Sequence, residues 1–485
     1  MKTWMIKALS LLGESLNPPK AELNELDWKA ALSPDKKRLT EHLSAFANYP
    51  GGGFLVYGVD ATGTPQGVHA KTIETTLNQL SNLGRAALEP PLSLDHAVET
   101  YETSRLLFVY IPESPVKPVH LRGRGIDEAF IRCSGTTRPA SRQEIGTMML
   151  NSRTPRWEEL RASVLLSDTA LISKLNTAPL FEMIERPIPA TVKDHLAWLV
   201  GEKFIIRDPS GGGYITNLGA MSAAHKLGEF PDLGRKAVRV IVYEGLNKSK
   251  TRLEQEGVFG YAVGFQGLLK FVTDILPQSE IIEKALRAKK SIYPVIALRE
   301  LIANALIHQD FTITGTGPLI EIFSDRIEIS NPGGLLPSKR LDRLIGTQPE
   351  SRNEQLAKAF RHYKICEERG SGLLKAGYEV ELYGLPPIEF ATTSTSFKVT
   401  LYSPRTFAAM APRERLEACY QHAILKHYSD SAMTNKSLRE RLKMPEKQRS
   451  MVSVIIQEAI DKGLIKSADP QNKSRKFAEY IPAWA

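Results

Sequence analysis

The stretch LRELIANALIHQDF, residues 298–311, decides how the second half of this chain is expected to fold, because its polar residues recur every four positions. Glu300, Asn304 and His308 would lie on one face of an α-helix, since residues four apart are neighbours on the helix surface. The other face would be apolar and would pack on a core; it comprises Leu298, Leu301, Ile302, Ala305 and Leu306. The pattern therefore predicts a helix that keeps a carboxylate, an amide and an imidazole together.

Two glycine-containing stretches follow this predicted helix, in residues 320–337 and 367–374, and they read Asn331-Pro332-Gly333-Gly334 and Gly370-Ser371-Gly372. The second stretch stands where a helix is expected to begin, so its backbone N–H groups could cradle phosphates. The alternative interpretation is an ordinary core helix followed by glycines that only make turns.

The three stretches, in this order and with Arg352-Asn353 between the last two, resemble the Bergerat or GHKL-type nucleotide fold. The resemblance is to the branch that accompanies AlbA modules in proteins classed as transcriptional regulators. It implies ATP and Mg²⁺ as cofactors, Glu300 as general base if ATP is hydrolysed, and Asn304 as Mg²⁺ ligand. The nucleotide-binding residues that it implies are Asn304, His308, Asn331, Gly333, Gly334, Gly370, Ser371 and Gly372.

One position departs from the family pattern. Asn331 stands where the family has an aspartate that accepts a hydrogen bond from the adenine amino group. An amide carbonyl oxygen can accept the same bond, or the substitution can change the preferred base. Hydrolysis also stays open, because a bound nucleotide can act purely as a switch.

The N-terminal part carries a second resemblance, on ELNELDWK (22–29), AFAN (45–48), GGG (51–53) and GVD (58–60), with FIRCSGTTRPA at 130–140. These pieces resemble the Schlafen-type AlbA module over residues 15–150. A helix is expected to end at Asn48, and the glycines would turn the chain into a buried strand at 53–59.

The resemblance implies possible roles for five charged residues of this module. In some members three carboxylates form a metal-dependent ribonuclease site, and the matching positions here are Glu22, Asp27 and Asp60. Asp27 is one methylene shorter than the usual glutamate, and we favour a module that binds nucleic acid without cutting it. Arg132 and Arg138 are expected to contact phosphates, although Arg138 could instead pair with a surface carboxylate.

Residues 412–485 are expected to form a winged helix, with helices at 413–428, 436–442 and 447–462 and a wing tip at 469–473. Asn435 is predicted to cap the second helix. The segment 405–485 has 15 lysines and arginines against 9 aspartates and glutamates, an imbalance that favours a polyanionic partner. The predicted nucleic-acid contacts are Lys447, Gln448 and Arg449 at the third helix and Lys473, Arg475 and Lys476 in the wing.

The expected fold class is a multidomain α/β (α+β) protein of 485 residues. The expected domains are an AlbA-like domain at 15–150, a helical and winged connector at 151–285, a Bergerat-type domain at 286–403 and the winged helix at 412–485. Three cysteines show no zinc spacing, and no apolar run approaches a membrane span. We therefore expect a cytoplasmic protein with no membrane partner; a homo-oligomer stays open.

Two functions remain open from the sequence. The favoured one is a regulator that binds ATP and nucleic acid, with duplex DNA preferred and RNA as the other choice, and whose nucleotide state biases DNA binding. The alternative is a metal-dependent ribonuclease that acts on tRNA or other RNA and is gated by ATP, in phage defence.

Overall fold

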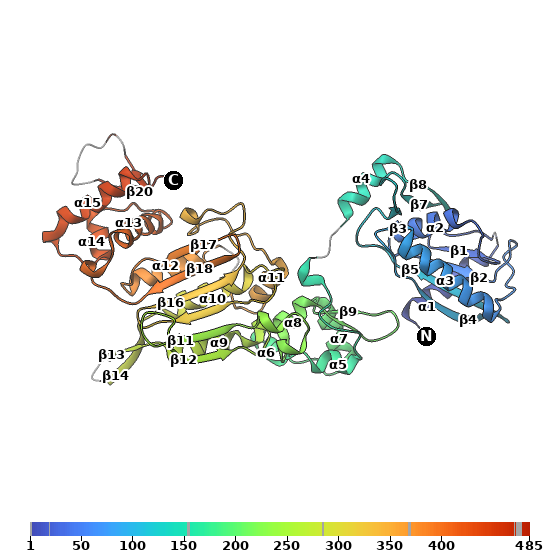
Figure 1. The fold of residues 1–485 in the computed structure, drawn as a ribbon, viewed down its shortest axis with the longest axis horizontal. Coiled ribbons are helices and arrows are strands. Elements are labelled where there is room, and N and C mark those ends of the chain that lie inside the picture. The colour runs from blue at the N-terminus through green and yellow to red at the C-terminus, as the bar shows by residue number, and fades with distance from the viewer. Residues whose placement is uncertain are drawn as a thin grey trace. The chain divides into compact units, whose positions relative to one another are not determined.

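The computed structural model describes residues 2–18, 20–152, 156–283, 286–366, 370–469, 471 and 478–485. The chain forms two compact units, Met1–Arg156 with Arg207–Gly212 and Trp157–Ile206 with Gly213–Ala485. Helices and strands alternate through both units, in several separate sheets (Figure 1). This mixture confirms the expected multidomain α/β class.

The first unit is built on a four-stranded sheet of order β1-β2-β5-β4, namely Leu26–Lys29, Gly53–Tyr57, Ser104–Ile111 and Asp95–Tyr101. Strand β2 pairs in parallel with β1, and helix α2 (Lys36–Asn48) connects the two, while the other pairs are antiparallel. The expected helix end at Asn48 and the strand beginning at Gly53 are confirmed.

Strand β2 is buried on both faces, which explains its uninterrupted apolar sequence. Leu55 and Tyr57 pack in one core with α2 and α3 (Ala70–Ala86), and Phe54 and Val56 pack in another with α1 (Thr3–Leu16). The smaller elements are β3 (Leu88–Glu89), β6 (His120–Leu121), β7 (Phe130–Cys133), β8 (Thr136–Pro139) and α4 (Arg142–Asn151).

The second unit contains a six-stranded sheet of order β12-β11-β15-β16-β18-β17. Its strands are Thr251–Glu256, Arg239–Tyr243, Leu319–Ile322, Arg326–Pro332, Ser396–Tyr402 and Glu389–Thr392. Helix α10 (Val295–Ile307) contacts β16 and lies between α9 (Tyr261–Ile275) and α12 (Gly372–Leu382) (Figure 1). The helix layer and the sheet share one large apolar core.

Short elements precede this sheet in the second unit: η1 (Trp157–Glu159), α5 (Asp168–Ser173), α6 (Ala178–Met183), α7 (Val192–Gly201), β9 (Ile205–Arg207), β10 (Gly213–Ile215), α8 (Asn217–Ala223), η2 (Leu227–Glu229) and η3 (Gly234–Lys236). The hairpin β13 (Gln278–Glu283) and β14 (Leu286–Ser291) leads into α10, and η4 (Leu341–Arg343) and α11 (Glu354–His362) separate β16 from α12.

After η5 (Phe407–Ala409), the C-terminal helices, our name for residues 412–485, comprise α13 (Pro412–His427), α14 (Asn435–Arg441), η6 (Glu446–Gln448) and α15 (Arg449–Asp461), with strands β19 (Ile465–Ser467) and β20 (Tyr480–Pro482). They share a core of their own. The order of elements agrees with the expected one, and the winged-helix class stays a prediction.

The helix boundaries in this region differ from the prediction by one or two residues. Thr434, not Asn435, caps α14, since its hydroxyl accepts from Ser437 N at 3.1 Å. Asn435 is instead the first helical residue, and its amide donates to Arg449 O. The third helix begins at Arg449, because the 3₁₀ turn η6 follows Pro445.

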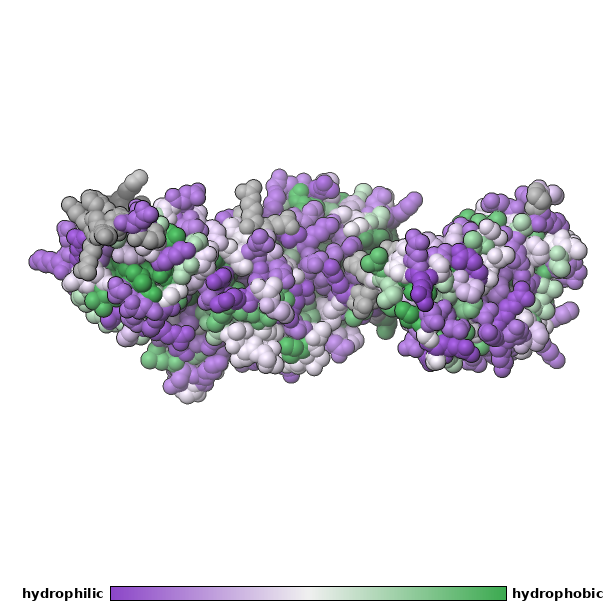
Figure 2. Space-filling model, turned by 90° about the horizontal axis from the view of Figure 1, so that it is seen from above, coloured by the Kyte–Doolittle hydropathy of each residue, from purple (hydrophilic) through white to green (hydrophobic). Residues whose placement is uncertain are grey.

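No helix in the described part of the chain is long and apolar enough to cross a membrane. The face drawn in Figure 2 is predominantly hydrophilic, with apolar residues in small areas.

Candidate functional site

Helix α10 buries its apolar residues in the core of the second unit and turns its polar row to a cavity of about 680 Å³. Glu300, Asn304 and His308 all line this cavity. Glu300 is buried, whereas Asn304 and His308 are half-buried. The three side chains that the helical spacing groups together therefore share one wall.

Both glycine-containing stretches reach the same cavity. Asn331 and Gly334 line it from the end of β16, and Gly370 and Gly372 line it from the start of α12. In the chain, Gly333 directly precedes Gly334, and Ser371 stands between Gly370 and Gly372. Three stretches far apart in sequence thus converge on one hollow.

The start of α12 touches the carboxylate of α10. A β-carbon at Gly372 would lie 2.6 Å from Glu300 Oε2 and 3.9 Å from Asn304 Nδ2. A methyl group at this position would displace the Glu300 carboxylate. The close approach places the first N–H groups of α12 beside the polar row, where a helix end favours anions.

The turn after β16 is held by backbone bonds. Asn331 is buried, and its Nδ2 donates to Pro332 O at 3.1 Å, which leaves its carbonyl oxygen as an acceptor. Gly333 adopts a φ of +94°, and its N–H donates to Thr395 O. A β-carbon there would lie 2.7 Å from the β-carbon of Asp310.

Arg352 and Asn353 tie this turn to the end of α10. The Arg352 guanidinium donates to Gly334 O at 2.7 Å and forms an ion pair with Asp310 at 3.0 Å. Asn353 Nδ2 donates to the carbonyl oxygens of Ile307 and Gln309. These two residues therefore brace the cavity walls.

Cationic groups line the cavity together with the carboxylates of Glu300, Glu350 and Glu354. Lys339, Lys358 and Arg361 line it beside Arg352. Burial, followed by the charges of Arg352 and Lys339, lowers the pKa of His308 to about 4, so its imidazole is neutral at pH 7. None of the sequence motifs includes Lys339, Lys358 or Arg361; the i,i+3 spacing of the last two on α11 was the available signal.

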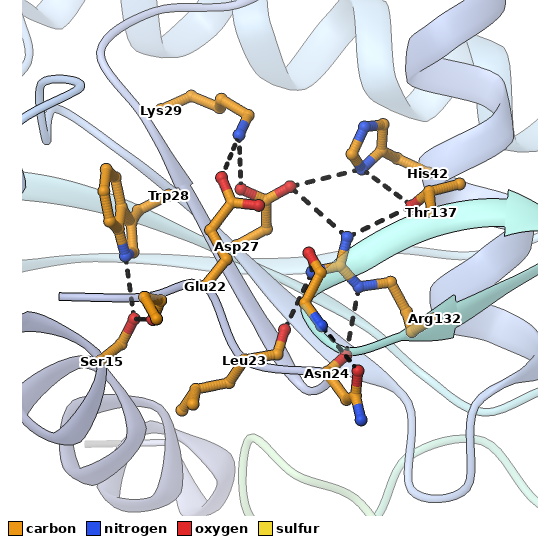
Figure 3. A network of polar contacts seen from close by, with 12 residues as sticks. Ser15, Glu22, Leu23, Asn24, Asp27, Trp28, Lys29, His42, Arg132 and Thr137 are labelled. Carbon is orange, nitrogen blue, oxygen red and sulfur yellow. Dashed lines mark hydrogen bonds and ion pairs between the residues drawn. The ribbon is translucent and has the colours of Figure 1, made fainter. Parts of the chain in front are cut away.

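In the first unit, Asp27 lies at the centre of a polar network (Figure 3). Its side chain is fully buried and accepts from Lys29 Nζ at 2.7 Å, and the same ammonium donates to Glu22 at 2.5 Å. The other oxygen, Oδ2, lies 3.4 Å from His42 Nδ1 and 3.7 Å from Arg132 Nη1. Burial and the nearby Asp27 raise the pKa of Glu22.

Asp60 has a different environment from these two carboxylates. Its Oδ1 accepts from Thr62 N, Thr62 Oγ1 and Thr64 N, and its Oδ2 accepts from Gln66 at 2.7 Å. These bonds lower the pKa of Asp60 to about 2. Among the residues that the structure describes, no three His, Cys, Asp or Glu side chains are grouped to hold a metal ion.

Arg132, which is expected to contact phosphate, makes its contacts within the module in this structure. Its side chain is fully buried and donates to Leu23 O at 2.9 Å and Gly135 O at 2.7 Å, so the guanidinium is used within the module. Arg138 is partly exposed and makes a bidentate pair with Glu144 at 3.0 and 2.7 Å, which is the alternative given for it above.

The predicted contacts of the C-terminal helices are only partly described. Lys447 and Arg449 are exposed, and Gln448 is half-buried, all at the start of α15. Lys473, Arg475 and Lys476 lie outside the described residues.

Two family models match the chain. Residues 22–141 match "Schlafen, AlbA_2", and residues 315–401 match "Putative ATP-dependent DNA helicase recG C-terminal". The chain carries a Schlafen AlbA_2 domain and a recG C-terminal ATPase-like domain. The network around Asp27 belongs to the AlbA_2 domain. The second match includes both glycine stretches of the cavity and begins after α10, so Glu300, Asn304 and His308 stand outside it.

Solved structures that are similar to the chain include the following two. A crystal structure of the DIP2311 protein from Corynebacterium diphtheriae is 15% identical, with a TM-score of 0.43, over 99% of this chain and 96% of that one. A solution structure of the N-terminal domain of a putative ATP-dependent DNA helicase RecG-related protein from Nitrosomonas europaea is 25% identical, with a TM-score of 0.21, over 28% of this chain and 92% of that one. None of the curated proteins compared with the chain matches it significantly.

Proposed function

We propose that this protein is a regulator that binds ATP and nucleic acid, and that its nucleotide state biases its binding to duplex DNA. The observation that carries the proposal is the cavity of about 680 Å³, into which α10, the turn after β16 and the start of α12 all project. The AlbA_2 and recG C-terminal matches support an ATP-dependent role connected with nucleic acid.

The dimensions and donors of the cavity suit a nucleoside triphosphate. From Glu300 to His308 the polar row extends by about 12 Å, at 1.5 Å per helical residue. The N–H groups at the start of α12 would meet phosphates at one end. At the other end of the cavity, the carbonyl oxygen of Asn331 would accept a hydrogen bond from the amino group of a base.

Asn304 and Glu300 supply the oxygens that a hard cation prefers, so we propose Asn304 as the Mg²⁺ ligand. A bound Mg²⁺ would supply positive charge that neutralises phosphate oxygens. Glu300 lies beside Asn304 on α10, and its carboxylate would accept a proton from water. It is therefore our candidate general base if ATP is hydrolysed.

Calorimetry with ATP and Mg²⁺ tests this proposal. Wild-type protein should bind ATP; Asn304→Ala should lose the Mg²⁺-dependent part of the affinity, and Glu300→Ala should keep binding but lose any hydrolysis. Asn247→Ala, at an exposed turn, is the matched control and should behave as wild type. Absence of ATP binding by well-folded wild-type protein would contradict the proposal.

The C-terminal helices are our candidate for the DNA contact, through the exposed cations at the start of α15. The ribonuclease alternative is less well supported, because Glu22 and Asp27 share Lys29 while Asp60 is occupied by its own turn.

A further inference from the structure

Residues 341–347, which we name the shared segment, contain two buried neighbours, Leu344 and Ile345. Leu344 and Thr347 line the nucleotide cavity. Ile345, next to Leu344 in the chain, is buried in the core of the C-terminal helices. Neighbouring residues of one short segment therefore contribute to the wall of the cavity and to the core of a different part of the second unit.

Two tyrosines at α13 hold this segment on either side of Leu344. Tyr420 OH donates to Asp342 O at 2.7 Å, and Tyr428 OH donates to Gly346 O at 2.5 Å. Tyr420 is buried, and its hydroxyl also accepts from Trp484 Nε1 at 3.1 Å. The position of Leu344 in the cavity wall thus depends on bonds to α13 and its C-cap.

Gly346 is fitted to the Tyr428 ring. Its φ is +81°, and a β-carbon on it would overlap the ring of Tyr428. A movement of the shared segment toward α13 is therefore blocked, and a movement away from it breaks the two hydroxyl bonds. Packed contacts of this kind transmit displacement because close-packed interiors deform little.

Helix α12 makes a second connection between the same two places. Its first residue, Gly372, lines the cavity. Further along, Tyr378 OH donates to Leu425 O at 2.7 Å, and a β-carbon at Gly377 would lie 3.1 Å from Leu425 Cδ2. Near the end of α12, Glu381 pairs with His422 of α13 at 3.0 Å.

We infer that the shared segment and α12 couple the nucleotide cavity to the C-terminal helices, so that nucleotide and DNA each change the affinity for the other. The inference rests on the proposed nucleotide and DNA binding and adds the route by which one affects the other. Both ends of the route lie in one unit, and coupling between binding sites must be reciprocal.

The test measures the affinity for ATP and Mg²⁺ in a variant whose changes lie outside the cavity. Tyr420→Phe with Tyr428→Phe removes both hydroxyl bonds and keeps the rings. The affinity of this variant for ATP should fall by roughly 5-fold or more, which is the lower end of the effects that coupled binding sites usually have on each other. The matched control is Tyr243→Phe, which removes the bond from Tyr243 OH to Glu321 in the large sheet, and it should bind ATP as wild type does.

A second measurement is hydrogen exchange in full-length wild-type protein. ATP should slow the exchange of backbone amides in α13, and Gly346→Ala should remove that protection. Unchanged ATP affinity in the double tyrosine variant, with unchanged exchange in α13, overturns the coupling while leaving nucleotide binding intact. An equal loss in Tyr243→Phe also overturns it, because the effect would then be one of general stability. Absence of ATP binding by wild type overturns the coupling and the proposed function together.

Discussion

The Glu300 carboxylate fills the space beside Gly372 that a side chain would need: a β-carbon on Gly372 would lie 2.6 Å from Oε2 of Glu300. The contact joins the start of α12 to the buried carboxylate of α10. Helix α12 also bonds to α13 through Tyr378. Gly372 therefore begins the helix that connects the cavity to the C-terminal helices.

Gly372→Ala should weaken ATP binding by roughly 10-fold, because the methyl group displaces the charged Glu300 carboxylate within the cavity that the phosphates would occupy. The overpacking should also cost about 1–3 kcal/mol of unfolding free energy. Gly267→Ala on α9 is the control: nothing lies within 4 Å of its β-carbon, so it should stabilise by about 0.5–1 kcal/mol. Calorimetry and urea unfolding measure the two effects, and wild-type affinity in Gly372→Ala would contradict the contact.

Asp27→Asn should destabilise the first unit strongly, because it removes the buried charge that Lys29 and Arg132 face. Breaking a buried pair from one side costs about 3–5 kcal/mol. Glu128→Gln in the same unit removes an exposed pair with Arg124 at 3.5 Å and should cost less than about 1 kcal/mol. Denaturation of the variants measures both, and similar small losses would show that the network is not stabilising.

We expect no cleavage of single-stranded RNA, tRNA or DNA by wild-type protein with Mg²⁺ or Mn²⁺. The Asp60 carboxylate already accepts bonds from Thr62, Thr64 and Gln66, and Lys29 donates to both of the other carboxylates and offsets one of their two charges. Incubation of each nucleic acid with protein and metal is the assay, with Asp60→Asn alongside. Cleavage by wild type that disappears in Asp60→Asn would promote the ribonuclease above the regulator.

Lys447→Glu with Arg449→Glu should weaken binding to duplex DNA and flatten its dependence on salt. Each lost phosphate contact lowers the slope of log K against log salt by about 0.9. Lys462→Glu, which follows the other end of α15 and pairs with Glu458 at 2.8 Å, is the matched control and should change the slope little. Equal effects from both variants would locate the DNA contact elsewhere.

Stability of the second unit should fall as the pH drops from 6.5 toward 4, in part because of His308. Its folded pKa of about 4 lies below the usual 6.5, so between these values the unfolded chain binds a proton that the folded chain excludes. The loss reaches about 3 kcal/mol below pH 4 and is absent above pH 6.5. Urea unfolding across this range should show a smaller drop in His308→Gln; an identical drop would assign the loss to other groups.

Local features of this protein were determined by the sequence itself. The apolar run of β2 and the two faces of α10 follow from periodicity, and the helix end at Asn48 follows from Pro50, which disfavours helical backbone at Tyr49. Both matched domains are expected from a resemblance to known families, because the motifs of each family stand in order along the chain.

Only the tertiary structure decided which distant groups meet. The enclosure of Arg132 by the carbonyl oxygens of Leu23 and Gly135, and the bonds from Tyr420 and Tyr428 to the shared segment, join residues that no local pattern relates. Such contacts depend on strand order and on how helices pack over the sheet. The spacing of residues could group Glu300, Asn304 and His308 on one helix, but packing alone placed α12 against them.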